Sequence, residues 1–151
     1  MDKEFFVKAI AENSDKLYRI AWTILRHSDD CRDALQETAL KAWEKRHTLR
    51  NEQYFSTWIT RILINESRNI QRKRKRLAPL EEAPEPSAPP PDPTLAMALH
   101  SLPEKLRLPL MLQYSEGMSY TDIAQALRIT EAAVRGRIHR AKEQLRKELE
   151  A

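Results

Sequence analysis

Between residues 55 and 76, one tryptophan, two asparagines and several cations lie at helical spacing. Together these side chains could bind a single strand of nucleic acid. Trp58 and Asn65 fall on one stripe of such a helix at about 100° per residue. Aromatic rings that stack on bases and cations that neutralise phosphates are the two means by which proteins hold single strands. A place for Trp58 in the helical core is the alternative interpretation. The candidate residues are Trp58, Arg61, Asn65, Asn69 and Arg72.

A second group of cations lies near the end of the chain. Residues 119–145 predict a short helix, a turn at 128–130 and a longer basic helix, which is the pattern of a helix-turn-helix. Ala124, Ile129 and Val134 stand where such a unit needs small or apolar contacts. Cations opposite the apolar row could reach base edges or phosphates in a major groove. The candidates are Arg135, Gly136, His139, Arg140 and Lys142.

The third candidate surface is an acidic stripe on a predicted helix that ends at about residue 46. Asp33, Gln36, Glu37 and Leu40 share one face of this helix, and Cys31 falls on the opposite, apolar face. Carboxylates alone would indicate a solvated face, whereas a leucine framed by them favours a docking surface for another protein. The place of Cys31 predicts a small buried hydrophobe rather than a redox sensor.

Helices are expected to position all three surfaces. Apolar residues recur at helical spacing in both halves of the chain, and neither half shows the sustained apolar–polar alternation of a β-strand. The fold class predicted is therefore all-α. Ser28 or Asp29 could cap the second helix, and Pro109 is expected to kink its helix or delay its start. Ser56, Ser119 and Thr130 are the caps expected for three further helices. The row expected to point inward on the last helix is Val134, Ile138, Ala141, Leu145 and Leu149.

A proline-rich, acidic stretch divides the chain. Seven of the nine prolines fall between Pro79 and Pro93, where they remove backbone donors and favour an extended linker. The formal net charge is +6 for residues 1–77, −4 for 78–93 and +2 for 94–151. The sequence thus predicts two small helical domains, 1–77 and 94–151, joined by a Pro-rich acidic linker over 78–93.

Composition limits the possible functions. The 151 residues carry a net charge of +4, which favours a polyanionic partner. No apolar run approaches the roughly 18 residues that span a bilayer, and Asp2 and Glu4 do not suit a signal peptide. One cysteine excludes an internal disulfide, and the four histidines lack zinc-site spacing. We find no phosphate loop and no nucleophile–base pair, so we expect a cytoplasmic, non-enzymatic protein without membrane insertion, metal or cofactor.

In order along the chain, these motifs resemble those of the extracytoplasmic-function (group four) sigma factors of bacterial RNA polymerase. Residues 30–43 (DCRDALQETALKAW) resemble the core-binding part of the family's region 2, and residues 55–76 (FSTWITRILINESRNIQRKRKR) resemble its minus-ten part. Residues 102–149 are similar to region 4. The resemblance implies sigma domain two, then sigma domain four, a helix-turn-helix domain, with no domain three between them.

The resemblance also implies a role for each surface. Asp33, Gln36, Glu37 and Leu40 would dock on the clamp helices of the polymerase's largest subunit, and the flap of the second-largest subunit would hold domain four. Trp58 and its neighbours would open and read the minus-ten element of promoter DNA, while the loop 47–54 helps to hold a flipped base. The candidates from Arg135 to Lys142 would face the minus-thirty-five element. An anti-sigma factor, often membrane-anchored in this family, is implied as a further partner.

Four positions depart from the family's pattern. Arg128 stands where the family often has Gly in the turn that ends a helix. A residue other than Gly in the left-handed conformation would cost about 1 kcal/mol there. Gly136 and Ala39 replace a frequent Ser and Phe, and Pro109 lies inside an expected helix. The alternative function is a free-standing helix-turn-helix regulator. It explains residues 119–149 but leaves the acidic stripe and the Trp58 face without a role.

Overall fold

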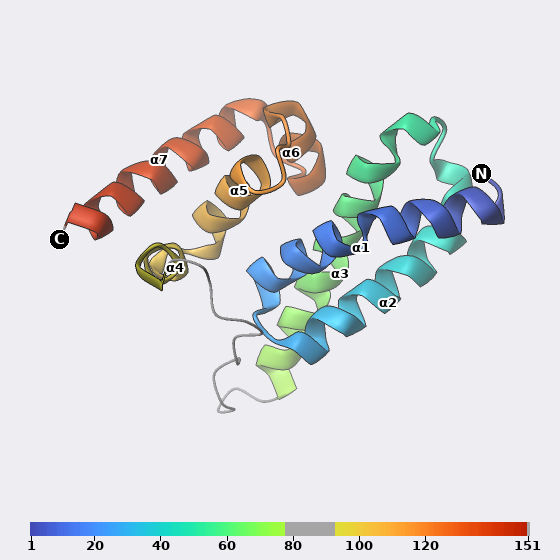
Figure 1. Ribbon diagram of the computed structural model, residues 1–151, viewed down its shortest axis with the longest axis horizontal. Coiled ribbons are helices and arrows are strands. Elements are labelled where there is room, and N and C mark those ends of the chain that lie inside the picture. The colour runs from blue at the N-terminus through green and yellow to red at the C-terminus, as the bar shows by residue number, and fades with distance from the viewer. Residues whose placement is uncertain (78–92, 151) are drawn as a thin grey trace. The chain divides into compact units, whose positions relative to one another are not determined.

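The computed structural model describes residues 1–77 and 93–150 of the chain. Every regular element within these ranges is a helix (Figure 1), which confirms the predicted all-α class. The chain separates into two compact units, residues 1–85 and 86–151. The predicted linker lies outside the described residues except for Pro93, where α4 begins, so its bounds stay a prediction.

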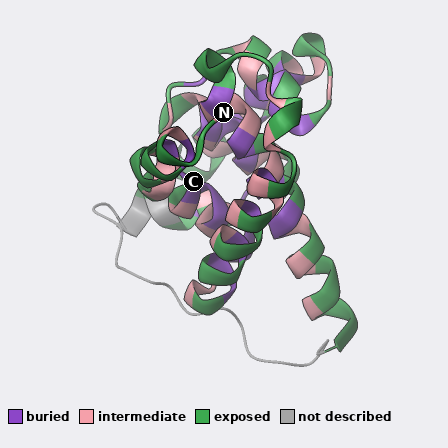
Figure 2. Cartoon of the chain, turned by 90° about the vertical axis from the view of Figure 1, so that its right-hand side faces the viewer, coloured by how far each residue is buried: buried purple, intermediate pink, exposed green. Residues whose placement is uncertain are grey.

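The first unit is built from three long helices that pack on one another (Figure 1). They are α1 (Lys3–Leu25), α2 (Ser28–Glu44) and α3 (Phe55–Leu77), with the 3-10 turns η1 (Arg46–Thr48) and η2 (Glu52–Tyr54) between α2 and α3. Each helix turns a buried stripe inward and an exposed one outward, as Figure 2 shows by colour. Ile59, Leu63 and Ile64 of α3 are at most 1% exposed and form the centre of this core.

Small residues bring α2 close to its neighbours. Cys31, Ala34, Thr38 and Ala42 are fully buried, and the hydroxyl oxygen of Thr38 has no hydrogen-bond partner. Burial raises the pKa of the Cys31 thiol to about 11, so the thiol stays protonated at neutral pH. Because the thiolate is the reactive form, Cys31 acts as a buried hydrophobe, as the helical pattern predicted.

The caps of α2 and α3 differ from the expected ones. His27 rather than Ser28 or Asp29 precedes α2, and its Nδ1 atom accepts a hydrogen bond from the Asp30 backbone N–H. The cap predicted at Ser56 is also wrong, because Phe55 before it is already helical. An N-cap residue requires an extended backbone, and here the chain enters α3 directly from the turn η2. Instead, Ser56 donates to the Asn13 amide oxygen and accepts from Lys16.

The second unit packs three shorter helices against a long one. They are α4 (Pro93–Ser101), α5 (Glu104–Tyr114), α6 (Tyr120–Leu127) and α7 (Glu131–Glu150). Its core consists of aliphatic side chains and Met118, and α7 adds Val134, Ile138 and Ala141 to it. The inward row then ends, because Leu145 is half-buried and Leu149 is 48% exposed. The inward place expected for Leu149 is therefore wrong.

The helix ends in this unit follow the sequence more closely. The hydroxyls of Ser119 and Thr130 accept from the backbone N–H groups of Asp122 and Ala133, which confirms both caps. Arg128 ends α6 in the left-handed conformation, with φ of 58°. Helix α5 starts at Glu104 and continues through the buried Pro109, so of the two alternatives expected for it, a kink or a delayed start, the delayed start does not occur.

Candidate functional site

The acidic stripe lies on the outer face of α2. Asp33, Gln36 and Glu37 are exposed, and Leu40 is 61% exposed although it is a large apolar residue. The structure therefore brings together all four residues predicted to dock on the polymerase. Their small neighbours on the opposite face of α2 are buried, so the helix presents this stripe in a fixed orientation.

An ion pair ties the start of α2 to the end of α3. The Nε atom of Arg74 donates to Oδ2 of Asp30 at 2.6 Å, and Asp30 is only 8% exposed. Arg74 therefore differs from its neighbours in the basic run 72–76, whose side chains are exposed. A buried carboxylate that lost its cation would be strongly unfavourable. The helix that carries the acidic stripe is thus joined directly to the helix with the aromatic and amide stripe.

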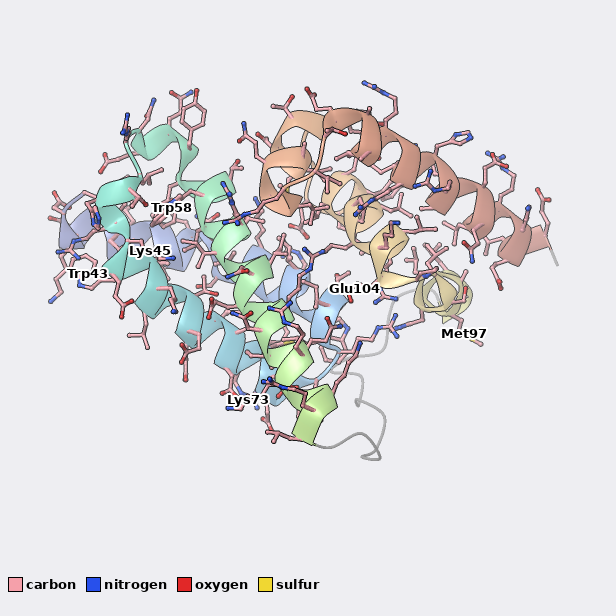
Figure 3. All side chains as sticks on the ribbon, turned by 180° about the vertical axis from the view of Figure 1, so that it is seen from behind. Trp43, Lys45, Trp58, Lys73, Met97 and Glu104 are labelled. Atoms are coloured by element: carbon pink, nitrogen blue, oxygen red, sulfur yellow. The ribbon has the colours of Figure 1, made fainter. Side chains whose placement is uncertain are left out.

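The second surface runs along α3. Arg61, Asn65, Asn69 and Arg72 are exposed, and the Arg72 guanidinium donates to the Asn69 amide oxygen. Trp58 is half-buried, and its ring centroid lies 5.6 Å from that of Phe55. Part of the indole therefore packs on the domain while part faces solvent. Figure 3 shows Trp58 near one end of the unit and Lys73 near the other.

An aromatic cluster supports the end of the unit where Trp58 lies. The centroid of the Phe6 ring is 5.1 Å from that of Trp43 and 6.2 Å from that of Phe55. Arg46 lies over the Trp43 ring, 3.9 Å from its centroid. We did not predict this contact, although Trp and Arg three residues apart at the end of a helix favour it.

The third surface is the outer face of α7. Arg135, His139, Arg140 and Lys142 are exposed, as expected, and Gly136 is half-buried. A Cβ atom on Gly136 would lie 3.3 Å from Nη1 of Arg140, so this guanidinium lies close to the space that the glycine leaves open.

Two contacts join α6 to α7 beside this surface. The Arg135 guanidinium is 5.4 Å from the centroid of the Tyr120 ring, and the Thr121 hydroxyl donates to Glu131 at 2.8 Å. The sequence pattern did not indicate Tyr120, because its partner lies on a different helix. Both contacts fix the start of α7 relative to α6.

Two other features bear on the chemistry of the site. Within residues 1–77 and 93–150, no group of three or more His, Cys, Asp or Glu side chains is arranged so that it could hold a metal ion. The helices described in those ranges also include none that is long and apolar enough to cross a membrane. Exposed charge, amides and aromatic rings are the groups that these surfaces offer.

Comparison with known families matches both units. The model of Sigma-70 region 2 matches residues 9–77, and the model of Sigma-70 region 4 matches residues 94–145. Among curated proteins, the ECF RNA polymerase sigma factor SigE of Mycolicibacterium smegmatis is 31% identical over 91% of this chain, which spans 58% of that relative's length. The ECF sigma-E factor of Haemophilus influenzae is 28% identical over 99% of this chain and 89% of its own.

Solved structures agree with these matches. The sigma factor RpoE from Bartonella quintana, in complex with the anti-sigma factor NepR, shares the fold with a TM-score of 0.80 at 23% identity over 97% of both chains. CnrH in complex with the cytosolic domain of CnrY gives a TM-score of 0.75 at 25% identity over 99% of this chain and 90% of CnrH.

The family models cover most of the chain in a consistent order, region 2 before region 4. Each model falls within one compact unit and includes the surfaces described on it. The chain therefore belongs to the sigma-70 family of RNA polymerase sigma factors, and within it to the extracytoplasmic-function group.

Proposed function

We propose that this protein directs bacterial core RNA polymerase to promoters through its three exposed surfaces. The carrying observation is that three helices present three different chemistries: a leucine among carboxylates on α2, an aromatic ring with amides and cations on α3, and cations on α7. A protein partner, a single strand and a duplex require different groups. As an initiation factor, the protein acts by binding rather than by catalysis.

The acidic stripe is proposed to dock on the clamp helices of the largest polymerase subunit. Leu40 supplies exposed apolar area at the centre, while Asp33 and Glu37 supply charge that can be matched by a basic partner. The ion pair between Asp30 and Arg74 joins this helix to α3. Docking through α2 would therefore fix the direction in which α3 faces the DNA.

The face of α3 is proposed to open and hold the minus-ten element. The exposed part of Trp58 offers a stacking surface, and Arg61 and Arg72 can neutralise phosphates. Asn65 and Asn69 have amide groups that can donate to and accept from base edges. A surface of this kind favours single-stranded DNA over the closed duplex, which shifts the equilibrium toward melting.

The face of α7 is proposed to read the minus-thirty-five element. Thr130 starts the helix, so Arg135 and His139 lie in its first half, where a recognition helix meets base edges. Arg140 and Lys142 follow on the same exposed side of the helix. The flap of the second-largest subunit is the proposed polymerase contact of this unit.

An anti-sigma factor is the third proposed partner, after core polymerase and promoter DNA. Support comes from the two similar structures, in which RpoE is bound to the anti-sigma factor NepR and CnrH to the cytosolic domain of CnrY. The proposed place of action is the cytoplasm, where polymerase and promoter DNA meet.

Run-off transcription with purified core polymerase on a library of genomic promoter fragments tests the proposal. We expect transcripts from fragments that share two elements at a fixed spacing, and none from core polymerase alone. Size-exclusion chromatography with and without core polymerase provides the companion measurement. A chain that binds duplex DNA as a dimer but neither joins core polymerase nor yields transcripts would be the free-standing regulator instead.

A further inference from the structure

The guanidinium of Arg46 makes two contacts with a single residue, Trp43. Its central carbon lies 3.9 Å from the centroid of the indole, and its Nη1 atom donates a hydrogen bond of 2.7 Å to the Trp43 carbonyl oxygen. A cation within about 6 Å of an indole centroid is attracted to the ring. Carbonyls in the last turn of a helix lack intrahelical donors. One side chain therefore covers the ring and also closes the end of α2.

The loop after Arg46 is attached to the same aromatic cluster at both ends. At its start, Arg46 holds Trp43, whose ring contacts Phe6 of α1. At its end, the loop enters α3 at Phe55, which is buried and also contacts Phe6. Figure 3 shows Trp43, Lys45 and Trp58 at this end of the unit. The loop 47–54 therefore lies beside the Trp58 end of α3.

Hydrogen bonds within the loop define its conformation further. The backbone N–H and the hydroxyl of Thr48 both donate to the Lys45 carbonyl, at 2.8 and 2.7 Å. The Asn51 side chain accepts from the backbone N–H of Gln53 at 2.9 Å. Polar side chains and Tyr54, which is 60% exposed, point outward from this framework.

We propose that Arg46 is a positioning residue that sets the conformation of the loop 47–54 and, through it, selectivity for one base of the opened minus-ten strand. The inference rests on the proposed function of the first unit, together with the role that the family resemblance implies for this loop, which is to help hold a flipped base. Arg46 is half-buried and its guanidinium is engaged with Trp43, so it is built to hold the loop rather than to meet a phosphate.

The test uses holoenzyme made with the full chain and premelted minus-ten templates that carry each single-base substitution. R46M keeps the aliphatic stem but loses the guanidinium, and R46K keeps the charge but loses the planar fork. We expect R46M to lower discrimination at one base position about three- to tenfold, and R46K to resemble it. Binding to core polymerase and the salt dependence of template binding should both stay at the wild-type level.

Three further single-residue variants and one double variant sharpen the result. W43F keeps an aromatic ring but offers the cation a weaker ring face, so it should lower base discrimination by part of the amount that R46M does. The double variant W43F/R46M should discriminate about as well as R46M alone. Lys8→Met removes one exposed cation from α1 and is the matched control, with discrimination expected to stay unchanged. If R46M lowers the unfolding temperature, R46Q replaces it, because its amide can still donate to the Trp43 carbonyl.

Different outcomes would overturn different claims. Full discrimination in R46M, or in R46Q where R46M is less stable than the wild type, would overturn the role of the Arg46 guanidinium. A uniform loss across all templates with a shallower salt dependence, rescued by R46K, would show direct phosphate binding instead. A wild-type holoenzyme without base preference on these templates would overturn the proposed reading of the minus-ten element by the first unit, and this inference with it.

Discussion

The two units reach stability and function by different means. The first packs three long helices around a core that includes Phe6 and Phe55 and ends in a cluster of rings beside Trp58. In the second, none of the buried side chains described within residues 93–150 is aromatic, and cations line the outer face of its longest helix.

This difference matches the two forms of DNA that the units are proposed to bind. A single strand exposes base faces, so the unit that holds it needs rings supported from behind by other rings. A duplex offers base edges and phosphates in a groove, so the other unit needs a straight cationic helix with a fixed start. The variants below test this contrast in order of decreasing expected effect.

Phe55→Ala should have the largest effect, on the folding of the first unit alone. Phe55 is 4% exposed and contacts the rings of Phe5, Phe6 and Trp58, so truncation should lower the free energy of unfolding by about 3–5 kcal/mol. Chemical denaturation followed by tryptophan fluorescence reports on this unit, because Trp22, Trp43 and Trp58 all lie in it. A loss below about 1 kcal/mol would show that the cluster does not support the fold.

Trp58→Ala should separate strand opening from promoter binding. The variant loses a stacking surface worth about 1–3 kcal/mol per base, so a closed complex should form but melt poorly. A template with a premelted minus-ten bubble should restore transcription. Because Trp58 packs partly on Phe55, far-ultraviolet circular dichroism must accompany the assay. Equal activity on duplex and bubble templates would remove the melting role.

Arg135→Ala and Arg146→Ala should separate base reading from anchoring on α7. Arg135 lies in the first half of the helix beside Tyr120, so its loss should cost about 1–3 kcal/mol and relax preference at one or two base pairs. Arg146 is exposed and paired with Glu143, and its loss should weaken binding to all promoter sequences slightly and by the same factor. Binding of holoenzyme to single-base promoter variants at two salt concentrations measures both. If Arg135→Ala lowers the affinity for every promoter variant by the same factor, α7 does not read bases through Arg135, and sequence specificity must come mainly from the first unit.

Arg128→Gly should have the smallest effect and a stabilising sign. Arg128 has φ of 58°, a conformation that costs a residue with a Cβ about 1 kcal/mol more than glycine. The free energy of unfolding of the second unit should therefore rise by at most about that amount. The gain is limited because glycine also adds conformational freedom to the unfolded chain, which opposes it. Thermal unfolding of the full chain checks the sign. A lower midpoint would mean that the arginine side chain stabilises the turn.

Sequence periodicity was sufficient to predict the fold class and the exposed faces, because both depend on spacing along one helix. Ser119 and Thr130 were predicted as caps for the same reason, since a cap is a local feature. Contacts between helices were missed. The pairs Asp30–Arg74 and Tyr120–Arg135 join residues that are far apart in sequence or on different helices, and each looks like part of a solvated surface when its own helix is considered alone.

The errors also have local physical causes. Ser56 has the residue type of a cap, but the turn η2 makes the preceding backbone helical and frees its hydroxyl for α1. Leu149 continues an apolar row, yet periodicity cannot show that the buried part of α7 ends at Ala141. The contacts that the three surfaces make with polymerase and DNA stay a prediction, because they depend on the partner's surface as well as on this one.

Binding of core polymerase by Glu37→Lys tests the central claim most directly. Reversing one charge in the middle of the exposed stripe should weaken binding to core polymerase by a few kcal/mol while leaving α2 folded. The matched control, Glu12→Lys, reverses an exposed charge on α1 and should bind as tightly as wild type. If Glu37→Lys also binds core polymerase with wild-type affinity, α2 is not the docking helix, and the proposed division of labour among the three surfaces is wrong.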